Sequence, residues 1–80
     1  MQDIKFQVLF EIDQSEKNVT AYIPALRLGA KGDTIEEARE NALDLIEMEY
    51  EAALSQGRQI PQHTAFMEVL TMPAKKTINI

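Results

Sequence analysis

The sequence has no cysteine and no tryptophan, and it has a single histidine. Without cysteine the chain forms no disulfide and offers no thiolate to a metal ion. The absence of cysteine fits a reducing compartment, so we expect a cytoplasmic location.

Long apolar runs are also missing, because no stretch approaches the ~20 residues that a membrane-spanning helix needs. Asp3 and Lys5 stand near the start, and the apolar residues after them alternate with polar ones. This pattern argues against a secretory signal. We therefore expect no membrane association.

Positive charge is scarce: 8 Lys and Arg stand against 13 Asp and Glu, a net charge of -5. A net negative charge repels phosphate backbones, so we expect no direct contact with nucleic acid. The same charge favours a basic protein partner. The alternative that an acidic balance simply keeps a small protein in solution stays open.

Eighty residues allow one small domain with a thin stability margin. We expect the domain to span residues 1–72, followed by a tail over 73–80 that is basic at Lys75 and Lys76. Association with a second copy or a partner would raise the stability by mass action. We therefore expect a homo-oligomer, a dimer or higher.

Alternating apolar residues predict strands before the middle of the chain. The run 4–12 has a period of two, broken only by Leu9, which indicates that its polar face also meets another surface. The polar run 13–18 predicts a loop, and 19–23 a second strand with Thr20 and Tyr22 outward. A weak third strand is expected over 27–31, bulged at Gly29 and Gly32.

A long helix follows. We expect Asp33 to cap it, with Glu36 three residues on in a capping-box arrangement. Gly57 and Pro61 indicate its end. The apolar residues recur at helical spacing, as expected of a stripe packed on the sheet: Ile35, Ala38, Ala42, Leu45, Ile46, Tyr50, Ala53 and Leu54.

Residues 65–72 predict a last strand that has apolar groups on both faces. Such a strand is covered on both sides, one by the helix and the other by a second subunit or partner. We expect the methionines Met48, Met67 and Met72 to fill the core, although methionine also suits adaptable binding surfaces. The predicted fold is α+β, a small βββαβ domain with a mainly antiparallel sheet and one long helix on one face.

No catalytic, cofactor-binding or metal-binding constellation is evident. His63 has no paired base, nucleophile or second ligand nearby in sequence. The acids are scattered over a strand, a loop and the outer arc of the helix, whereas a two-metal nuclease needs acids that converge on one site. A metal-dependent nuclease is therefore the weakest of the readings, and we expect a protein that is not an enzyme.

Three segments together resemble a known family. They are Ala21-Tyr22-Ile23-Pro24-Ala25-Leu26, then Gly32-Asp33-Thr34-Ile35-Glu36-Glu37-Ala38, then Gly57-Arg58-Gln59-Ile60-Pro61. Their order and spacing are similar to those of the HicB-type antitoxins, small bacterial proteins that silence RNA-cutting toxins. The resemblance covers about residues 4 to 72.

This resemblance implies a partial RNase H-like domain without the acids of the true nuclease. It also implies a partner, a small basic HicA-like toxin whose active site the antitoxin blocks. The chain departs from the family after Leu26, where Arg27-Leu28-Gly29-Ala30 replaces the usual turn. Residues 1–80 contain no DNA-binding domain of the kind that antitoxins of this family often carry, so operator binding is not carried over.

From face and charge we predict six contact residues for such a partner. Tyr22, Leu26 and Arg27 stand at the rim of the second strand, while acids flank the first hairpin at Glu11, Asp13 and Glu16. Ordinary packing beneath the turn remains the alternative for the apolar residues among them. The alternative for the whole chain is an orphan, homo-oligomeric binding or scaffold module of the same family without a toxin.

Overall fold

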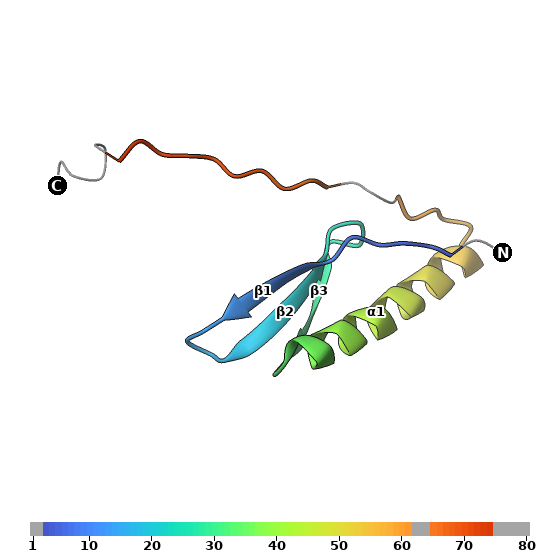
Figure 1. Cartoon of the computed structure of the whole chain (residues 1–80). Helices are drawn as coiled ribbons and strands as arrows, with labels where there is room; N and C mark the ends of the chain where they lie inside the picture. The colour runs from blue at the N-terminus through green and yellow to red at the C-terminus, as the bar shows by residue number, and fades with distance from the viewer. Residues whose placement is uncertain (1–2, 62–64, 75–80) are drawn as a thin grey trace.

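The computed structural model describes residues 3–61 and 65–74. It contains β1 (Leu9–Asp13), β2 (Asn18–Ile23), β3 (Leu28–Gly32) and α1 (Ile35–Ser55) in that order (Figure 1). The three strands form one antiparallel sheet in the order β1-β2-β3. The α+β class predicted from the sequence, with one helix packed on a small sheet, is confirmed.

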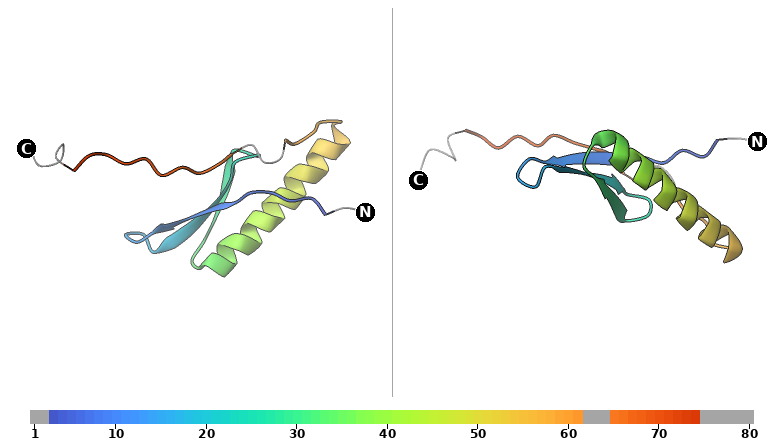
Figure 2. Two further views of the ribbon diagram at one scale, coloured as in Figure 1. Left: turned by 45° about the horizontal axis from the view of Figure 1, so that its top comes forward. Right: turned by 90° about the horizontal axis from the view of Figure 1, so that it is seen from below.

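The helix covers one face of the sheet and leaves the other open (Figure 2). Along β2, Val19, Ala21 and Ile23 are buried beneath the helix, while Thr20 is half-buried and Tyr22 exposed on the far side. The alternation predicted for this strand is therefore confirmed. Pairing is continuous from Val19↔Gly32 to Ile23↔Leu28, so the bulge expected in β3 is wrong.

The start of α1 lies one residue later than predicted. Thr34, and not Asp33, is the N-cap, and its hydroxyl accepts from the Glu37 N–H at 3.0 Å. The Glu37 carboxylate in turn accepts from the Asp33 N–H at 2.8 Å. This reciprocal pair satisfies two backbone donors that the helix itself leaves free. The predicted cap, Asp33 with Glu36, is therefore wrong by one residue, because Glu37 is the acid that reaches back over the turn.

The end of α1 agrees with the prediction. Gly57 adopts a positive φ of 68°, which glycine tolerates without steric cost. The Arg58 N–H donates to the Ala53 carbonyl at 2.8 Å and the Gly57 N–H to the Leu54 carbonyl at 3.2 Å. This is the Schellman arrangement, which closes the last turn and releases the chain from the helix axis.

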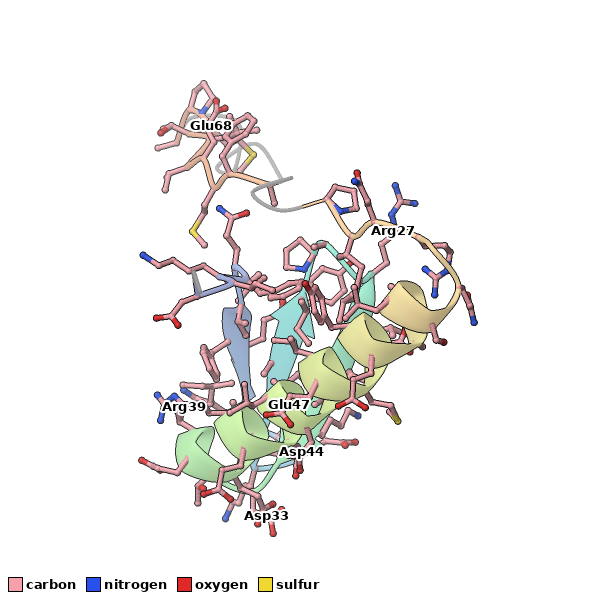
Figure 3. The ribbon with its side chains drawn as sticks, turned by 90° about the vertical axis from the view of Figure 1, so that its right-hand side faces the viewer. Arg27, Asp33, Arg39, Asp44, Glu47 and Glu68 are labelled. Carbon is pink, nitrogen blue, oxygen red and sulfur yellow. The ribbon has the colours of Figure 1, made fainter. Side chains whose placement is uncertain are left out.

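The outer side of α1 is acidic. Asp44 and Glu47 lie on the side of the helix that faces away from the sheet (Figure 3), and Glu40 and Glu51 are exposed like them. Arg39 lies at the other flank, where its guanidinium carbon is 5.5 Å from the centre of the Phe10 ring. That arginine shields part of a half-buried aromatic ring, a favourable cation–π geometry.

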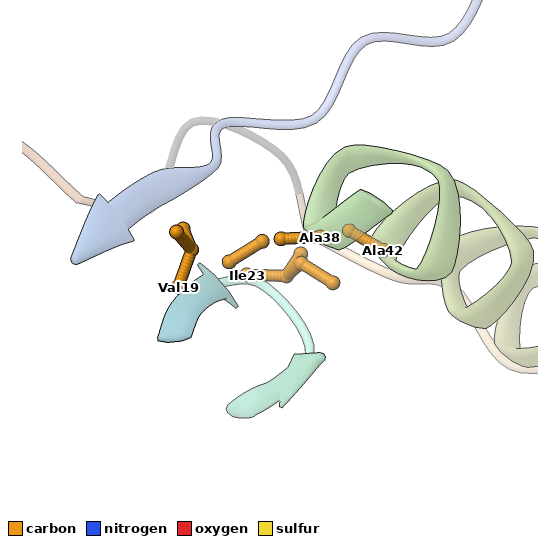
Figure 4. Close-up of a cluster of buried hydrophobic side chains, with 5 residues drawn as sticks. Val19, Ile23, Ala38 and Ala42 are labelled. Atoms are coloured by element: carbon orange, nitrogen blue, oxygen red, sulfur yellow. The ribbon is translucent and has the colours of Figure 1, made fainter. Parts of the chain in front are cut away.

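The core is small, and its members are mostly alanine. Its centre is Ile23, which has no exposed surface, packed with Ala38 and Ala42 of the helix and with Val19 and Ala21 of β2 (Figure 4). Among the described residues, Ile23 is the largest fully buried side chain. The small alanine side chains allow the helix to lie close to the sheet. The core therefore depends on close packing of the two elements and not on large apolar side chains.

Gly32 makes that close approach possible at the start of the helix. A Cβ built on Gly32 would lie 2.8 Å from the Glu37 carbonyl carbon and 2.9 Å from the Ala38 Cα. Real Cβ atoms do not approach backbone so closely, so only glycine fits between β3 and the first helical turn. Gly32 thus has a packing role in place of the bulge expected there.

No fourth strand forms, which corrects the predicted βββαβ order to βββα within the described residues. Residues 65–72 are extended, unpaired with the sheet and exposed from Phe66 on, and we call them the arm (Figure 1). A strand needs a ladder partner, and apolar side chains on both faces do not supply one. Met48, Met67 and Met72 are exposed, so the prediction that they fill the core is wrong.

The first strand is also shorter than its pattern predicts. Residues 4–8 continue the alternation but precede the paired segment, which begins at Leu9. Phe6, Val8 and Phe10 are half-buried against the core from the same side.

None of the described helices is long and apolar enough to cross a membrane.

Candidate protein-binding surfaces

The open face of the sheet carries a mixed row of side chains. Residues paired across strands share a face, so Leu9 lies beside Tyr22, and Glu11 and Lys31 lie on either side of Thr20. Leu9 is 37% exposed and Tyr22 36%. The two form an apolar spot that borders on a polar strip. In the sequence, Leu9 is the apolar residue that breaks the polar face of the first strand, and it lies on this open face.

The turn between β1 and β2 carries Asp13 and Glu16 at one end of the sheet, with Lys17 next to Glu16. One Asp13 carboxylate oxygen accepts from the Ser15 N–H at 3.0 Å, from the Ser15 hydroxyl at 2.9 Å and from the Glu16 N–H at 3.0 Å. The bond from the Glu16 backbone, followed by that from the Ser15 side chain, lowers the pKa of Asp13. Asp13 is thereby fixed as a charged turn residue, and Glu16 is exposed beside it.

The turn between β2 and β3 lies at the opposite end. The Leu26 and Arg27 N–H groups both donate to the Ile23 carbonyl, at 3.0 and 2.9 Å. Arg27 has a positive φ of 56° and an exposed side chain. Leu26 is half-buried and packs against the core cluster. Packing beneath the turn, the alternative to a partner contact given above, therefore explains why an apolar residue stands at position 26.

The six predicted contact residues therefore do not form one patch. Asp13 and Glu16 lie at one end of β2, and Leu26 and Arg27 lie about 17 Å away at the other, given the rise of a strand. Glu11 and Tyr22 lie between them on the open face. A partner would need to span the open face to contact both ends.

An apolar groove lies on the helix side of the sheet. It runs between the segment leading into β1 and the first half of α1, and Arg39 closes one flank. Leu43 and Ile4 are exposed along it. The lining of the groove is mainly apolar, contributed by Ile4, Phe6, Val8, Phe10, Ala42, Leu43 and Ile46.

A second open groove, of about 400 Å³, lies where the arm leaves the domain. Gln7 joins the two parts: its Nε2 donates to the Ala65 carbonyl at 3.0 Å, and its Oε1 accepts from the Ala65 N–H at 3.4 Å. Phe66 and Met67 line the groove with Pro24. No sequence signal marks Gln7, because its partner is 58 residues away.

Among the described residues, no three acids or histidines gather closely enough to hold a metal ion. The exposed acids of α1 follow the helix surface without converging. His63 lies outside the described residues. The described surfaces present exposed apolar and acidic side chains.

Comparison of this chain with family models, with curated proteins and with solved structures found no match.

Proposed function

We propose that this chain is a non-enzymatic antitoxin of the HicB type that binds a small, basic, RNA-cutting toxin and covers its active site. The observation that carries the proposal is the open face of the sheet. Leu9 and Tyr22 stand side by side there and are followed by Glu11 and Asp13. An apolar spot with acids on its β1 side suits a basic protein surface, with Lys31 of β3 as a cation on the same face.

The motif residues support the proposal through the fold. Pro24 and Leu26 form the β2–β3 turn, Gly32 admits the helix, and Thr34 with Glu37 caps it. In this chain the segments that resemble the family thus have structural roles. Partner contacts are then made by residues outside these structural positions, on the exposed face that the motifs hold in place.

The mechanism is occlusion. A ribonuclease needs basic groups to hold the RNA backbone, and an acidic protein that occupies them competes directly with the RNA. The net charge of -5 also steers a basic partner toward the complex. Salt should therefore slow association more than it speeds dissociation.

The test requires a candidate toxin, and a small basic protein encoded beside this chain would be the first choice. The purified chain is titrated into an RNA-cleavage assay of that protein, and we expect cleavage to stop at a fixed stoichiometry. No complex and no loss of cleavage would refute the proposal. Glu11→Lys should weaken inhibition about tenfold or more, because it reverses a charge on the open face.

A matched control separates the open face from the acidity of the whole chain. Glu51→Lys makes the same charge change on the exposed side of α1. We expect it to leave inhibition nearly unchanged. Equal weakening by Glu11→Lys and Glu51→Lys would show that overall charge, and not the open face, is recognised.

A binding or scaffold module that self-associates without a toxin is the second candidate. The exposed apolar arm favours it, since an antitoxin needs no such segment to cover an active site. The two functions differ in one requirement. The module assembles from this chain alone, and the antitoxin acts only with its toxin.

A further inference from the structure

The arm exposes more apolar surface than any other described segment. Phe66 is 89% exposed, Met67 74%, Val69 87%, Leu70 82% and Met72 62%. Single exposed apolar residues are common on proteins, but a contiguous run of them marks an interaction site. The dimensions of the chain agree, because its radius of gyration is 16.8 Å, where a compact domain of this length has about 12 Å.

Both faces of the arm need cover. Alternate residues of an extended chain point to opposite sides, so Phe66 and Leu70 share one side, and Met67 and Val69 the other. Glu68 is the one charged residue within the arm. This pattern is typical of a strand held between two layers.

The arm does not pair with its own sheet. At Ala65 the side-chain amide of Gln7 makes the two hydrogen bonds that a neighbouring strand would make. Because these bonds come from a side chain, they do not extend the main-chain ladder of the sheet to Ala65. Beyond this point the arm diverges from the sheet, as Figure 1 and the left view of Figure 2 show.

The sheet nevertheless has a place for a fourth strand. β1 is an outer strand, so one edge of Leu9–Asp13 has unpaired N–H and C=O groups. Such an edge is a template for another strand. Ile12 on β1 is 63% exposed, and the apolar groove lined by Phe10 and Leu43 lies on the same side of the sheet.

We propose that the arm of one chain adds as a fourth strand to the free edge of β1 in a second copy, and that the second copy returns its own arm in the same way. One interface with twofold symmetry then covers the exposed arm and pairs the free edge of β1 in both copies. On its own sheet the arm would cover one face and leave the other in water. In the exchanged dimer the two arms lie at the interface, where each second face is covered by the other copy.

The area is sufficient for a stable dimer. With residue areas on the order of 200 Å², the five exposed residues of the arm present about 800 Å², which is one partner's share of a standard interface. Two arms supply both shares before the surface of the acceptor edges is counted. Exchange therefore reaches the size of a specific complex before any contact through the open face is counted.

The chemistry of the arm favours a second copy over a basic partner. Glu68 is its one charge, so bringing the arm to another acidic chain adds little repulsion. A basic toxin would be recognised through acids, and these lie on the open face, on the β1–β2 turn and on the outer side of α1, not on the arm. The arm is recognised through apolar contacts and main-chain hydrogen bonds, and the free β1 edge with its apolar groove provides both.

The test measures the mass of the full chain alone, by native mass spectrometry and light scattering over a range of concentrations. We expect twice the 9.1 kDa of one chain. Val69→Asp places a charge in the arm and should weaken the dimer at least tenfold. The control is Met48→Asp, an equally drastic change at an exposed residue of α1 outside the grooves described above, and it should leave the dimer intact.

Hydrogen exchange distinguishes the arrangements. In the exchanged dimer the amides of residues 66–72 and of the β1 edge exchange slowly, and this protection is lost on dilution. A monomer at every concentration overturns the proposal, as does a dimer that Val69→Asp leaves unchanged. Protection of the arm in a monomer would mean pairing with its own sheet. A complex that forms only after a basic toxin is added would assign the arm to that toxin.

Discussion

The sheet-and-helix unit, β1–β3 with α1, and the arm differ in where their apolar residues lie: the arm has the larger apolar share, six of its eight residues, yet its apolar side chains are exposed from Phe66 on. In residues 18–53 the apolar residues recur with the period of each strand or helix, so that one face of each element is buried. Ile23 is fully enclosed. In the arm they occupy both faces, and the chain has nowhere of its own to bury them. Hydrophobic content alone therefore does not decide burial. The number of faces that the same chain can cover decides it.

The difference also separates stability from assembly. A small alanine-rich core gives the unit a unique geometry, but its enclosed apolar volume is low. Chains of this length have a free energy of unfolding of about 4–12 kcal/mol. Changes inside the unit should therefore lower the free energy of unfolding, whereas changes in the arm should alter assembly.

The largest effect is expected at Gly32. Gly32→Val places side-chain atoms where the Glu37 and Ala38 backbone lies, so the helix must move off the sheet. We expect a loss of about 4 kcal/mol, most of the stability of the unit, measured by urea denaturation. Gly29→Ala is the control, since its Cβ meets a Thr20 methyl group at 3.3 Å and no closer backbone, and it should change stability by less than about 1 kcal/mol.

The next effect is at the centre of the core. Ile23→Ala removes the fully buried side chain and leaves a cavity between β2 and α1, at a cost of about 3 kcal/mol. Ile12→Ala makes the same chemical change on a residue that is 63% exposed, and it should cost less than about 1 kcal/mol. Similar losses for both variants in thermal or urea unfolding would contradict the core described here.

A smaller effect is expected at the helix cap. Thr34→Ala removes the hydroxyl that accepts from the Glu37 N–H, and we expect a loss of about 1 kcal/mol. Thr34→Ser keeps the acceptor and should retain most of the stability. If Asp33 were the cap, as the sequence alone predicts, Asp33→Ala would cost more than Thr34→Ala in the same denaturation experiment.

The regular part of the fold could be predicted because its signals are local. The period of two in β2 assigns Val19 and Ala21 to the core. Gly57 ends the helix because glycine, which has no Cβ, tolerates the positive φ needed there. The choice between Asp33 and Thr34 could not be predicted. Both are good caps, and the turn geometry that lets Glu37 reach back decides between them.

The arm and the candidate site could not be predicted in the same way, because they depend on distant residues. The apolar groups on both faces of residues 65–72 predict a covered strand, but only the structure, with Gln7 beside Ala65 and no ladder in this segment, shows that it does not join its own sheet. The six contact residues follow from charge and face, yet only the register places Glu11 and Tyr22 together on the open face and separates Asp13 from Arg27.

The turn between β1 and β2 should give a small stability change that depends on pH. The folded-state pKa of Asp13 is lowered, mainly by the bond from the Glu16 N–H and then by the Ser15 hydroxyl. A lowered pKa adds stability above the ordinary value of 3.8, and this stability is lost as the pH falls through the folded-state pKa. An NMR titration should show the Asp13 midpoint below 3.8, and Ser15→Ala should move it upward.

The smallest effect should come from the most hydrophobic segment. Phe66→Ser replaces a large apolar side chain that is 89% exposed. At concentrations too low for association, we expect the free energy of unfolding to change by less than about 0.5 kcal/mol. Replacing a buried apolar residue of the sheet-and-helix unit by serine would lower the free energy of unfolding by several kcal/mol. The two regions therefore differ in what their apolar residues contribute to stability. A loss of several kcal/mol in the dilute monomer would show instead that the arm packs on its own domain.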